Sequence, residues 1–265
     1  TSMIGCIVQA RMGSSRLPKK VMKKIENDFT ILDYVIKQLK SSKNIEKIIV
    51  ATTILEEDNI IFDYLFSHKY EVFRGSSEDV LDRFYQCAKK FSIDTIVRIT
   101  ADNPLIDPKI IDIVIDEYKN DKYDLVTNTL KRTFPYGTEV EVFSFKSLEK
   151  AWKNAKRPSE REHVTPFIRD PQNKFILNNI EYQGNFSHLR YTVDRIDDLK
   201  LVKEIIKNIS TRPILIQDVI KLYKQKPEIF EINKNIKHDG YESSLKKDNQ
   251  YFKSQEPNGT INEKN

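Results

Sequence analysis

The chain has 265 residues, of which 39% are hydrophobic and 31% charged, and its formal net charge is +5. This length suits one large domain or two small ones with a substantial core, and the modest charge, with both signs interspersed, does not by itself indicate a nucleic-acid partner. Two cysteines, Cys6 and Cys87, argue against a disulfide framework and for a reducing compartment, and the absence of a recognisable membrane span or signal peptide leads us to expect a cytoplasmic protein.

The first half of the chain alternates apolar runs of strand character with amphipathic runs of helical spacing. Strands are predicted at 4–8, 47–53, 70–73 and 94–100, and helices at 31–39, 56–68, 78–88 and 108–118. Such alternation implies an α/β fold with a mostly parallel sheet and helices on both faces.

The regular alternation of predicted strands and helices ends near residue 123, where predicted strands follow one another more closely. Strands are predicted at 123–128, 138–143, 175–182 and 189–193, and helices at 145–152, 157–169 (broken at Pro166), 197–209 and 213–223. From Lys226 onward polar residues dominate, so we expect an extended arm that ends in disorder, with Gly240–Tyr241 as a docking point.

The segment 4–21, IGCIVQARMGSSRLPKKV, is an apolar run that breaks into a cationic loop. The loop carries four cations and two hydroxyls: Arg11, Arg16, Lys19, Lys20, Ser14 and Ser15. A buried strand that feeds such a loop is how α/β proteins present a phosphate site at the carboxyl end of the sheet. The charge suits a triphosphate, with arginine as a bidentate partner and lysine as a point charge. The alternative is a solvated basic turn, because the loop matches neither Walker A nor G-x-G-x-x-G.

Two carboxylates follow predicted strands. Asp102 ends the strand 94–100, and Asp194 follows 189–193, so both are expected at the same edge of the sheet. Mg²⁺ takes one or two carboxylates together with phosphate oxygens, which makes the pair a candidate metal site. The alternative for Asp102 is that it caps the helix that starts near Pro108, and Asp197 and Asp198 are expected in the first turn of the helix after Asp194.

Two further clusters are weaker candidates. Arg161, Glu162 and His163 lie together, but one helical turn cannot place them all on one face, so His163 is either a catalytic base or a binding or structural residue. The segment 74–77 with Asp82 contacts a ribose or base, or is an ordinary capped helix start. No catalytic triad order, zinc spacing or basic-aromatic RNA-binding surface is recognisable.

Seven motifs in order resemble a known family. They are QARMGSSRLPKK, VATT, FRGSSEDVLDRF, RITADNPLIDP, TFPYGTEVEVFS, REHVTPFI and LRYTVD. Together they look like the cytidylyltransferase family, which includes CMP-KDO synthetases and acylneuraminate cytidylyltransferases, and most of all like its spore-coat polysaccharide nucleotidyltransferase group. The resemblance covers roughly residues 3–225, and it leaves 226–265 as a C-terminal extension, partly disordered.

The resemblance implies a Rossmann-like nucleotidyltransferase fold, Mg²⁺ and a homodimer built from about residues 130–190, which also hold the acceptor. It implies catalytic roles for Arg11, Lys20, Asp102 and Asp194, the last two as metal ligands. The implied nucleotide-binding residues are Ala10, Arg11, Gly13, Ser14, Arg16, Lys20, Thr52, Arg74, Ser76, Asp82, Thr100 and Ala101. The implied acceptor-binding residues are Glu139, Arg161, Glu162 and His163. Lys19 and Ala101 stand where the family often has glycine.

The implied reaction is transfer of CMP from CTP to a sugar acid, a sugar phosphate or a related acceptor, with release of pyrophosphate, for surface polysaccharide or glycoconjugate biosynthesis. No nucleic-acid or membrane partner is implied. Three alternatives remain: a guanylyl- or uridylyltransferase on the same fold, a glycosyltransferase that uses a nucleotide sugar, and a non-catalytic nucleotide-binding protein. Asp102-Asn103-Pro104 lacks the second carboxylate of the D-x-D motif typical of glycosyltransferases, and the intact cationic loop argues against loss of catalysis.

Overall fold

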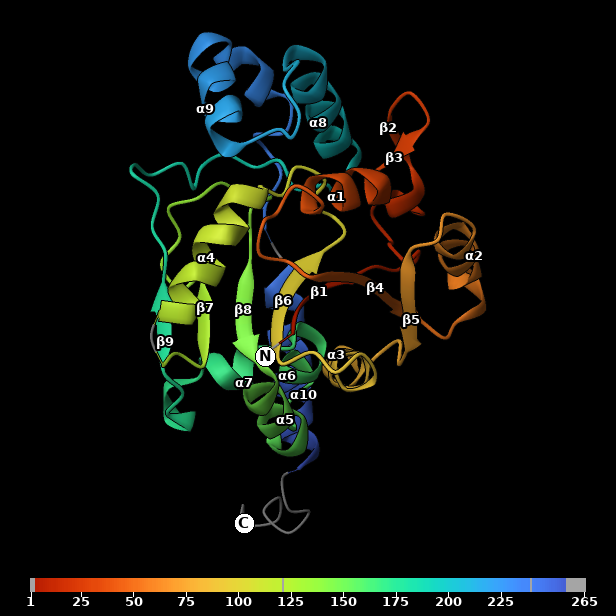
Figure 1. The fold of residues 1–265 in the computed structure, drawn as a ribbon, viewed down its shortest axis with the longest axis vertical. Helices are drawn as coiled ribbons and strands as arrows, with labels where there is room; N and C mark the ends of the chain where they lie inside the picture. Colours follow the sequence, from red (N-terminus) through yellow and green to blue (C-terminus); the bar gives the residue numbers. More distant parts are fainter. Residues whose placement is uncertain (1–2, 121, 239, 256–265) are drawn as a thin grey trace, which may run out of the picture.

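A seven-stranded sheet forms the centre of the computed structural model, which describes residues 3–120, 122–238 and 240–255 (Figure 1). The strand order is β5-β4-β1-β6-β8-β7-β9. The parallel part consists of β5 (Glu71–Gly75), β4 (Lys47–Thr53), β1 (Ile4–Gln9) and β6 (Thr95–Thr100). The remaining strands are β8 (Glu141–Ser144), β7 (Leu125–Thr127) and β9 (Leu177–Asn179). β8 is antiparallel to both β6 and β7, and β9 is parallel to β7. The predicted mostly parallel α/β sheet is confirmed.

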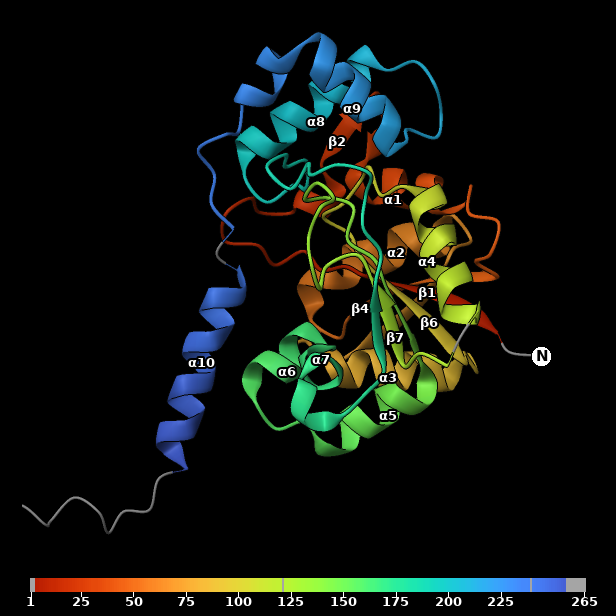
Figure 2. The same cartoon turned by 90° about the vertical axis from the view of Figure 1, so that its left-hand side faces the viewer.

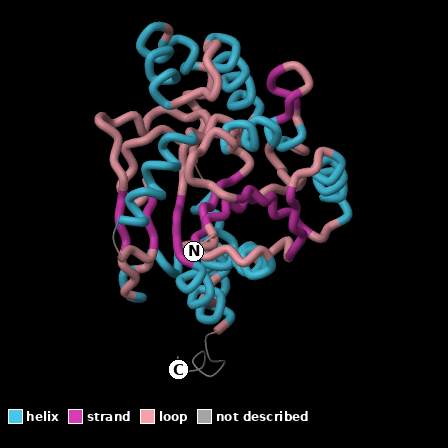
Figure 3. Tube along the Cα trace, viewed as in Figure 1, coloured by secondary structure: helices cyan, strands magenta, loops and turns pink. Residues whose placement is uncertain are grey.

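Helices cover both faces of this sheet, as predicted (Figure 3). One face packs against α1 (Ile31–Leu39), α2 (Asn59–Ser67) and α4 (Pro108–Asn120), and the other against α3 (Val80–Lys90) and α5 (Phe145–Asn154). Because successive strand side chains alternate between the faces, Cys6 and Val8 enter the first core and Ile7 enters the second.

A third hydrophobic cluster lies beyond the carboxyl end of the parallel strands, at the top of Figure 1. It is built by α8 (Ile196–Asn208), α9 (Ile216–Gln225) and the hairpin β2 (Lys24–Glu26) with β3 (Phe29–Thr30). Short 3₁₀ turns complete the chain: η1 (Lys20–Met22), η2 (Glu56–Asp58), η3 (Pro171–Asn173) and η4 (Pro227–Glu231). Leu17 joins this cluster, so the loop after β1 is fixed to it.

Several predicted strands are shorter or absent. The segment 189–193 alternates like a strand, but it makes a single bridge, between Arg190 and Tyr136. Its backbone instead bonds to loops, because the Val193 N–H donates to the Asp102 carbonyl (2.8 Å). The predicted strands at 138–143 and 175–182 shrink to β8 and β9. The predicted helix at 157–169 is divided into α6 (Pro158–His163) and α7 (Pro166–Arg169).

The C-terminal segment differs most from expectation. An extended arm is wrong for Gly240–Ser254, which form the helix α10 beside α6 (Figure 2). The docking role expected near Tyr241 is confirmed, since its ring contacts His163 edge to face with centroids 5.3 Å apart. Residues 256–265, expected to be disordered, lie outside the described residues. Among the helices described here, none combines the length and apolar character needed to cross a bilayer.

Candidate active site

The loop after β1 is held by backbone bonds at both ends. The Met12 N–H donates to Asp58 (2.7 Å), and the Lys19 N–H donates to the Met12 carbonyl (3.3 Å). Ser14 Oγ accepts from the Leu17 N–H (3.3 Å). Lys19 adopts φ 60°, ψ 24°, which is the left-handed region that favours glycine. The backbone therefore explains why glycine suits this position, and lysine occupies it at some conformational cost.

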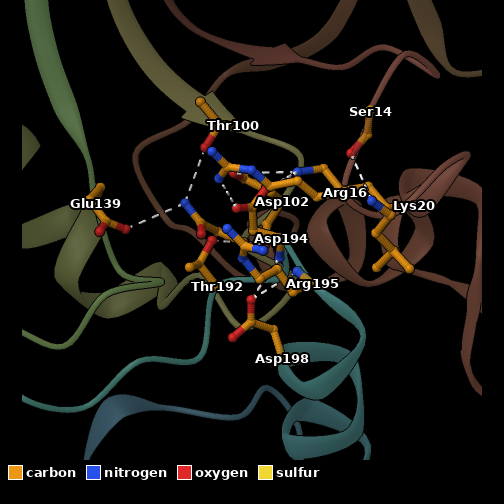
Figure 4. Close-up of polar contacts among 12 residues, drawn as sticks. Ser14, Arg16, Lys20, Thr100, Asp102, Glu139, Thr192, Asp194, Arg195 and Asp198 are labelled. Carbon is orange, nitrogen blue, oxygen red and sulfur yellow. Dashed lines mark hydrogen bonds and ion pairs between the residues drawn. The ribbon is translucent and has the colours of Figure 1, made fainter. Parts of the chain in front are cut away.

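Two loop cations and the two predicted carboxylates meet at the carboxyl end of the sheet (Figure 4). Arg16 Nη1 lies 2.6 Å from Asp194, and Lys20 Nζ lies 3.5 Å from Asp194 and 4.0 Å from Asp102. The chain brings these residues together from positions 16 to 194, although the segment before Asp194 forms no strand and is held beside Asp102 by the bond from the Val193 N–H to the Asp102 carbonyl. In this arrangement the two positive charges balance the two negative ones.

Asp102 and Asp194 are each positioned by a short local network. Thr100 Oγ1 donates to Asp102 (2.6 Å). Asp198, fully buried at the start of α8, accepts from the Asp194 N–H (3.1 Å) and forms a two-pronged ion pair with Arg190. Burial alone would raise the pKa of Asp194, but the hydrogen bond from Arg16 and the charge of Lys20 outweigh it and hold that pKa below its usual value. Asp194 therefore stays ionised.

The donor set fits a hard divalent cation that binds together with a nucleotide. Within the described ranges, no cluster of three or more His, Cys, Asp or Glu side chains forms an all-protein metal cage. Mg²⁺ typically uses one or two carboxylates and completes its shell with phosphate oxygens and water. Asp102 and Asp194 supply such a pair.

A cavity of about 690 Å³ adjoins this centre. Thr100 and Glu139 line it near Asp102, and Arg98, Glu141 and Arg169 form its floor. Glu141 pairs with both arginines at 2.7 and 3.1 Å. Burial would raise the pKa of Glu141, but Arg98 and Arg169 outweigh it and lower that pKa. The floor is thus a set of mutually neutralised donors and acceptors.

His163 lines the same cavity, next to a strained turn. Val164 is buried at φ 70°, ψ −52°, and the Thr165 N–H donates to the His163 carbonyl (2.8 Å). This is a γ-turn of the rare, strained type, and a β-branched residue at positive φ is a true outlier. Burial, followed by the charge of Arg98, lowers the pKa of His163. The turn separates α6 from α7 and directs His163 and Thr165 into the cavity.

A second cavity of about 680 Å³ lies on the other side of α6. Gln9, Arg11, Arg83, Arg161 and Glu162 contribute to its lining. Arg161 forms a bidentate ion pair with Asp79, with N–O distances of 3.0 and 2.7 Å. Arg161, Glu162 and His163 are consecutive in α6, so their side chains point in different directions. Glu162 and Arg161 thus face this cavity, whereas His163 faces the first.

Four of the predicted nucleotide-binding residues lie outside the lining of both cavities, and three of them are bonded to other parts of the chain. Arg74 donates to the carbonyls of Thr53 and Leu55 and to Asn59, and Asp82 accepts from Trp152 (2.8 Å). Ser76 Oγ accepts from the Asp79 N–H (3.0 Å), and the helix start is capped by Asp79, which accepts from the Asp82 N–H (3.0 Å). The Thr52 hydroxyl is buried without a hydrogen-bond partner among the described residues. None of these four residues is among the described residues that line the two cavities.

Several charged residues of the site were not among the site residues predicted from the sequence. Arg98 interrupts the apolar strand TIVRIT, and Glu141 lies at an inward position of β8. Arg98, which lines the first cavity, also donates to Gln9 (3.1 Å), which lines the second. A charged residue within a buried strand was the available signal, because such a residue must be paired.

A sequence model described as Cytidylyltransferase matches residues 5–237. An uncharacterized protein of Methanocaldococcus jannaschii is 42% identical over 237 residues, which cover 89% of this chain and 96% of that protein. The spore coat polysaccharide biosynthesis protein SpsF of Bacillus subtilis is 29% identical over 232 residues, covering 84% and 94%. The structure of a cytidylyltransferase from Leptospira borgpetersenii superposes with a TM-score of 0.84 at 34% identity, covering 90% of this chain and all of that one.

The matched region contains the loop after β1, both carboxylates, α6 and α7, and it ends before α10. The predicted resemblance is therefore confirmed, and this chain belongs to the cytidylyltransferase family.

Proposed function

We propose that this protein transfers a cytidylyl group from CTP to an oxygen of a sugar acid, a sugar phosphate or a related acceptor, and releases pyrophosphate. The observation that carries the proposal is the meeting of Arg16 and Lys20 with Asp102 and Asp194 at the carboxyl end of the sheet. Cations from a loop after the first strand suit a polyphosphate, and the carboxylate pair suits the Mg²⁺ that accompanies it.

The two cavities support a division of the site. The cavity lined by Gln9 and Arg11 continues from the end of β1, so we assign the nucleoside to it. The cavity lined by Thr100, Glu139 and His163 opens beside Asp102, so we assign the acceptor to it. The α-phosphate would then lie between them, within reach of the loop cations.

The chain's own residues mainly orient the reactants and balance charge. An acceptor oxygen forms a new bond to the α-phosphorus while the bond to the β-phosphate oxygen breaks. Arg16 and Lys20 exchange their contacts with Asp194 for contacts with the departing pyrophosphate, whose developing charge they stabilise. Mg²⁺, held by Asp102 and Asp194, would supply polarisation of the α-phosphate when bound. Thr100 and Asp198 keep the two carboxylates in position.

The similarity to the spore coat polysaccharide biosynthesis protein SpsF of Bacillus subtilis supports a role for the product in surface polysaccharide biosynthesis. A sugar-type acceptor also agrees with the polar floor of the cavity, where Glu141 is paired with Arg98 and Arg169. We further propose that the protein acts in the cytoplasm, where CTP is available, and as a homodimer.

Asp102→Asn tests the proposal, because it keeps the shape of the side chain and removes its charge. We expect pyrophosphate release with CTP, Mg²⁺ and an acceptor panel to fall by about 10³-fold or more, as for removal of a major electrostatic group. The matched control is Asp197→Asn, since Asp197 is half-exposed and pairs with Lys200 at the surface. Near-normal pyrophosphate release by Asp102→Asn would refute the role of this carboxylate. Greater release with GTP or UTP than with CTP in the wild type would refute CTP as the nucleotide substrate.

A further inference from the structure

The helix α10 lies outside the region that the family shares, yet it is docked on the candidate active site. The family match ends at residue 237, and α10 begins at Gly240. Ser244 Oγ lies 2.5 Å from His163 Nε2 and donates to Glu162 (2.7 Å). Asp248 accepts from both the backbone N–H and the hydroxyl of Ser159. Three residues of α6, namely Ser159, Glu162 and His163, are thus bonded to one helix.

Four residues of α10 that meet α6 or the first cavity lie on one face, and Lys247 beside them pairs with Glu162 (3.5 Å). Tyr241, Ser244, Leu245 and Asp248 follow the i, i+3, i+4, i+7 spacing that aligns side chains along a helix. Ser244 and Asp248 are almost fully buried against α6. Tyr241 and Leu245 remain 50% and 42% exposed, and both line the acceptor-side cavity. The polar residues therefore anchor the helix, and the apolar ones form a wall of the cavity.

This wall and the cavity floor have complementary chemistry. The floor is polar, with Glu141 shared by Arg98 and Arg169 and with Arg132 paired to Glu139 at 2.7 Å. Its donors and acceptors suit hydroxyl groups, whereas the Tyr241 ring and Leu245 suit a C–H surface. A carbohydrate ring has both, namely a rim of hydroxyls and an apolar face. The volume of about 690 Å³ is in the range of small-molecule sites.

We propose that α10 is the acceptor-specificity element of this protein, in which Tyr241 and Leu245 form an apolar platform for the ring of a carbohydrate acceptor. Ser244 and Asp248 are positioning residues that hold this platform against α6. The proposal rests on the proposed cytidylyltransferase activity for its turnover readout, but the carbohydrate contact itself can be measured without turnover.

The test compares the full chain with a double variant, Tyr241→Ala with Leu245→Ala, which leaves the Ser244 and Asp248 anchors intact. The matched control is Glu242→Ala with Lys246→Ala, on the exposed side of the same helix. The probes are KDO, N-acetylneuraminate, glucose 1-phosphate and glycerol 3-phosphate. Saturation-transfer NMR measures their binding in the presence of CTP and Mg²⁺, and pyrophosphate release measures turnover.

We expect at least one of the three carbohydrate probes to bind the wild type, and the double variant to bind it about tenfold more weakly, with KM raised by the same factor and kcat little changed. CTP affinity by calorimetry should match the wild type, because the cationic loop is untouched. Unchanged carbohydrate binding in the double variant, equal loss in the control variant, or no carbohydrate bound by the wild type would overturn the proposal. Carbohydrate binding that depends on Tyr241 and Leu245 without pyrophosphate release would support it and refute the proposed function alone.

Discussion

At the scale of single residues, the centre of this site is a balance of charge. Arg16 and Lys20 neutralise Asp194, and Lys20 also reaches Asp102. Their types and positions were predictable from the sequence, because a cationic loop after the first strand and carboxylates at strand ends have a chemical reason. Arg98 and Glu141 were not predicted, because their pairing depends on the antiparallel register of β6 with β8.

Lys20→Ala should weaken CTP binding about tenfold or more, because the variant loses a charge-assisted contact to phosphate worth roughly 1.5–3 kcal/mol. Isothermal titration with CTP and Mg²⁺ measures the effect. Lys24→Ala is the matched control, since Lys24 carries the same charge but pairs with Asp28 at the tip of the β2–β3 hairpin. Equal CTP affinity in wild type and Lys20→Ala would argue that the loop does not hold the phosphates.

Val164 should reverse the usual order of alanine and glycine substitutions. Glycine normally costs about 0.5–1 kcal/mol more than alanine, but alanine at Val164 retains the strain of a positive φ, roughly 1–2 kcal/mol. We therefore expect Val164→Gly to be more stable than Val164→Ala by up to about 1 kcal/mol in urea unfolding. The same pair at Val142, buried in β8, should keep the normal order. If both sites show the normal order, the turn at Val164 stores no measurable strain.

At the scale of elements, hydrophobic periodicity predicted the helices and strands whose buried face is set by packing against the sheet. The alternation in β1 and the amphipathic spacing in α1 and α3 place their residues in the cores where they were expected. The segment 189–193 has the same alternation, but its backbone donors are taken by loop carbonyls of Asp102 and Tyr136, so no strand forms. The helix α10 was missed because its docking face mixes serine and aspartate with few apolar residues, and their bonding partners lie far away in sequence.

The segment before α10 is anchored by a stack that is sensitive to protonation. His238 accepts a hydrogen bond from Arg190 and stacks on Tyr136 with ring centroids 3.5 Å apart, while Arg132 lies on Tyr136 at 3.7 Å. Burial, with the nearby positive charges of Arg190 and Arg132, lowers the pKa of His238 to about 4, although Asp198 partly opposes this. The neutral ring is thus the form that fits the fold.

The sign of the pH dependence follows from that shift. Between about pH 6.5 and pH 4 the unfolded chain binds a proton at His238 and the folded chain does not, so stability falls as the pH falls through this window. We expect His238→Gln, which keeps a neutral acceptor for Arg190, to lose less stability than the wild type over the same range. Urea unfolding at pH 7 and pH 4.5 measures the difference, and His188→Gln, at an exposed position, is the control. An equal loss in wild type and His238→Gln would exclude this anchor as a pH-sensitive contact.

At the scale of the whole molecule, the site lies where three hydrophobic clusters meet. Two clusters cover the faces of the sheet, and the third, under α8 and α9, holds Leu17 of the cationic loop. Asp102 extends from the sheet, and Asp194 precedes α8. The position of the cationic loop therefore depends on the packing of the third cluster against the sheet, whereas the cavity that His163 lines depends on α6, α7 and α10.

This arrangement predicts that metal and nucleotide affect stability only together. Without CTP, the negative charges of Asp102 and Asp194 are already balanced by Arg16 and Lys20, so EDTA should leave Tm unchanged. With Mg²⁺ and CTP at about 100 times Kd, binding should add roughly 2.7 kcal/mol and raise Tm by about 5–10 °C. EDTA should abolish that increase, because Arg16 and Lys20 cannot balance both the two carboxylates and the triphosphate without the metal. Differential scanning fluorimetry of wild type and Asp194→Asn measures Tm with Mg²⁺ or with EDTA, each in the presence and in the absence of CTP. A drop in Tm caused by EDTA in the absence of nucleotide would instead reveal a structural metal and contradict the charge balance described for the loop.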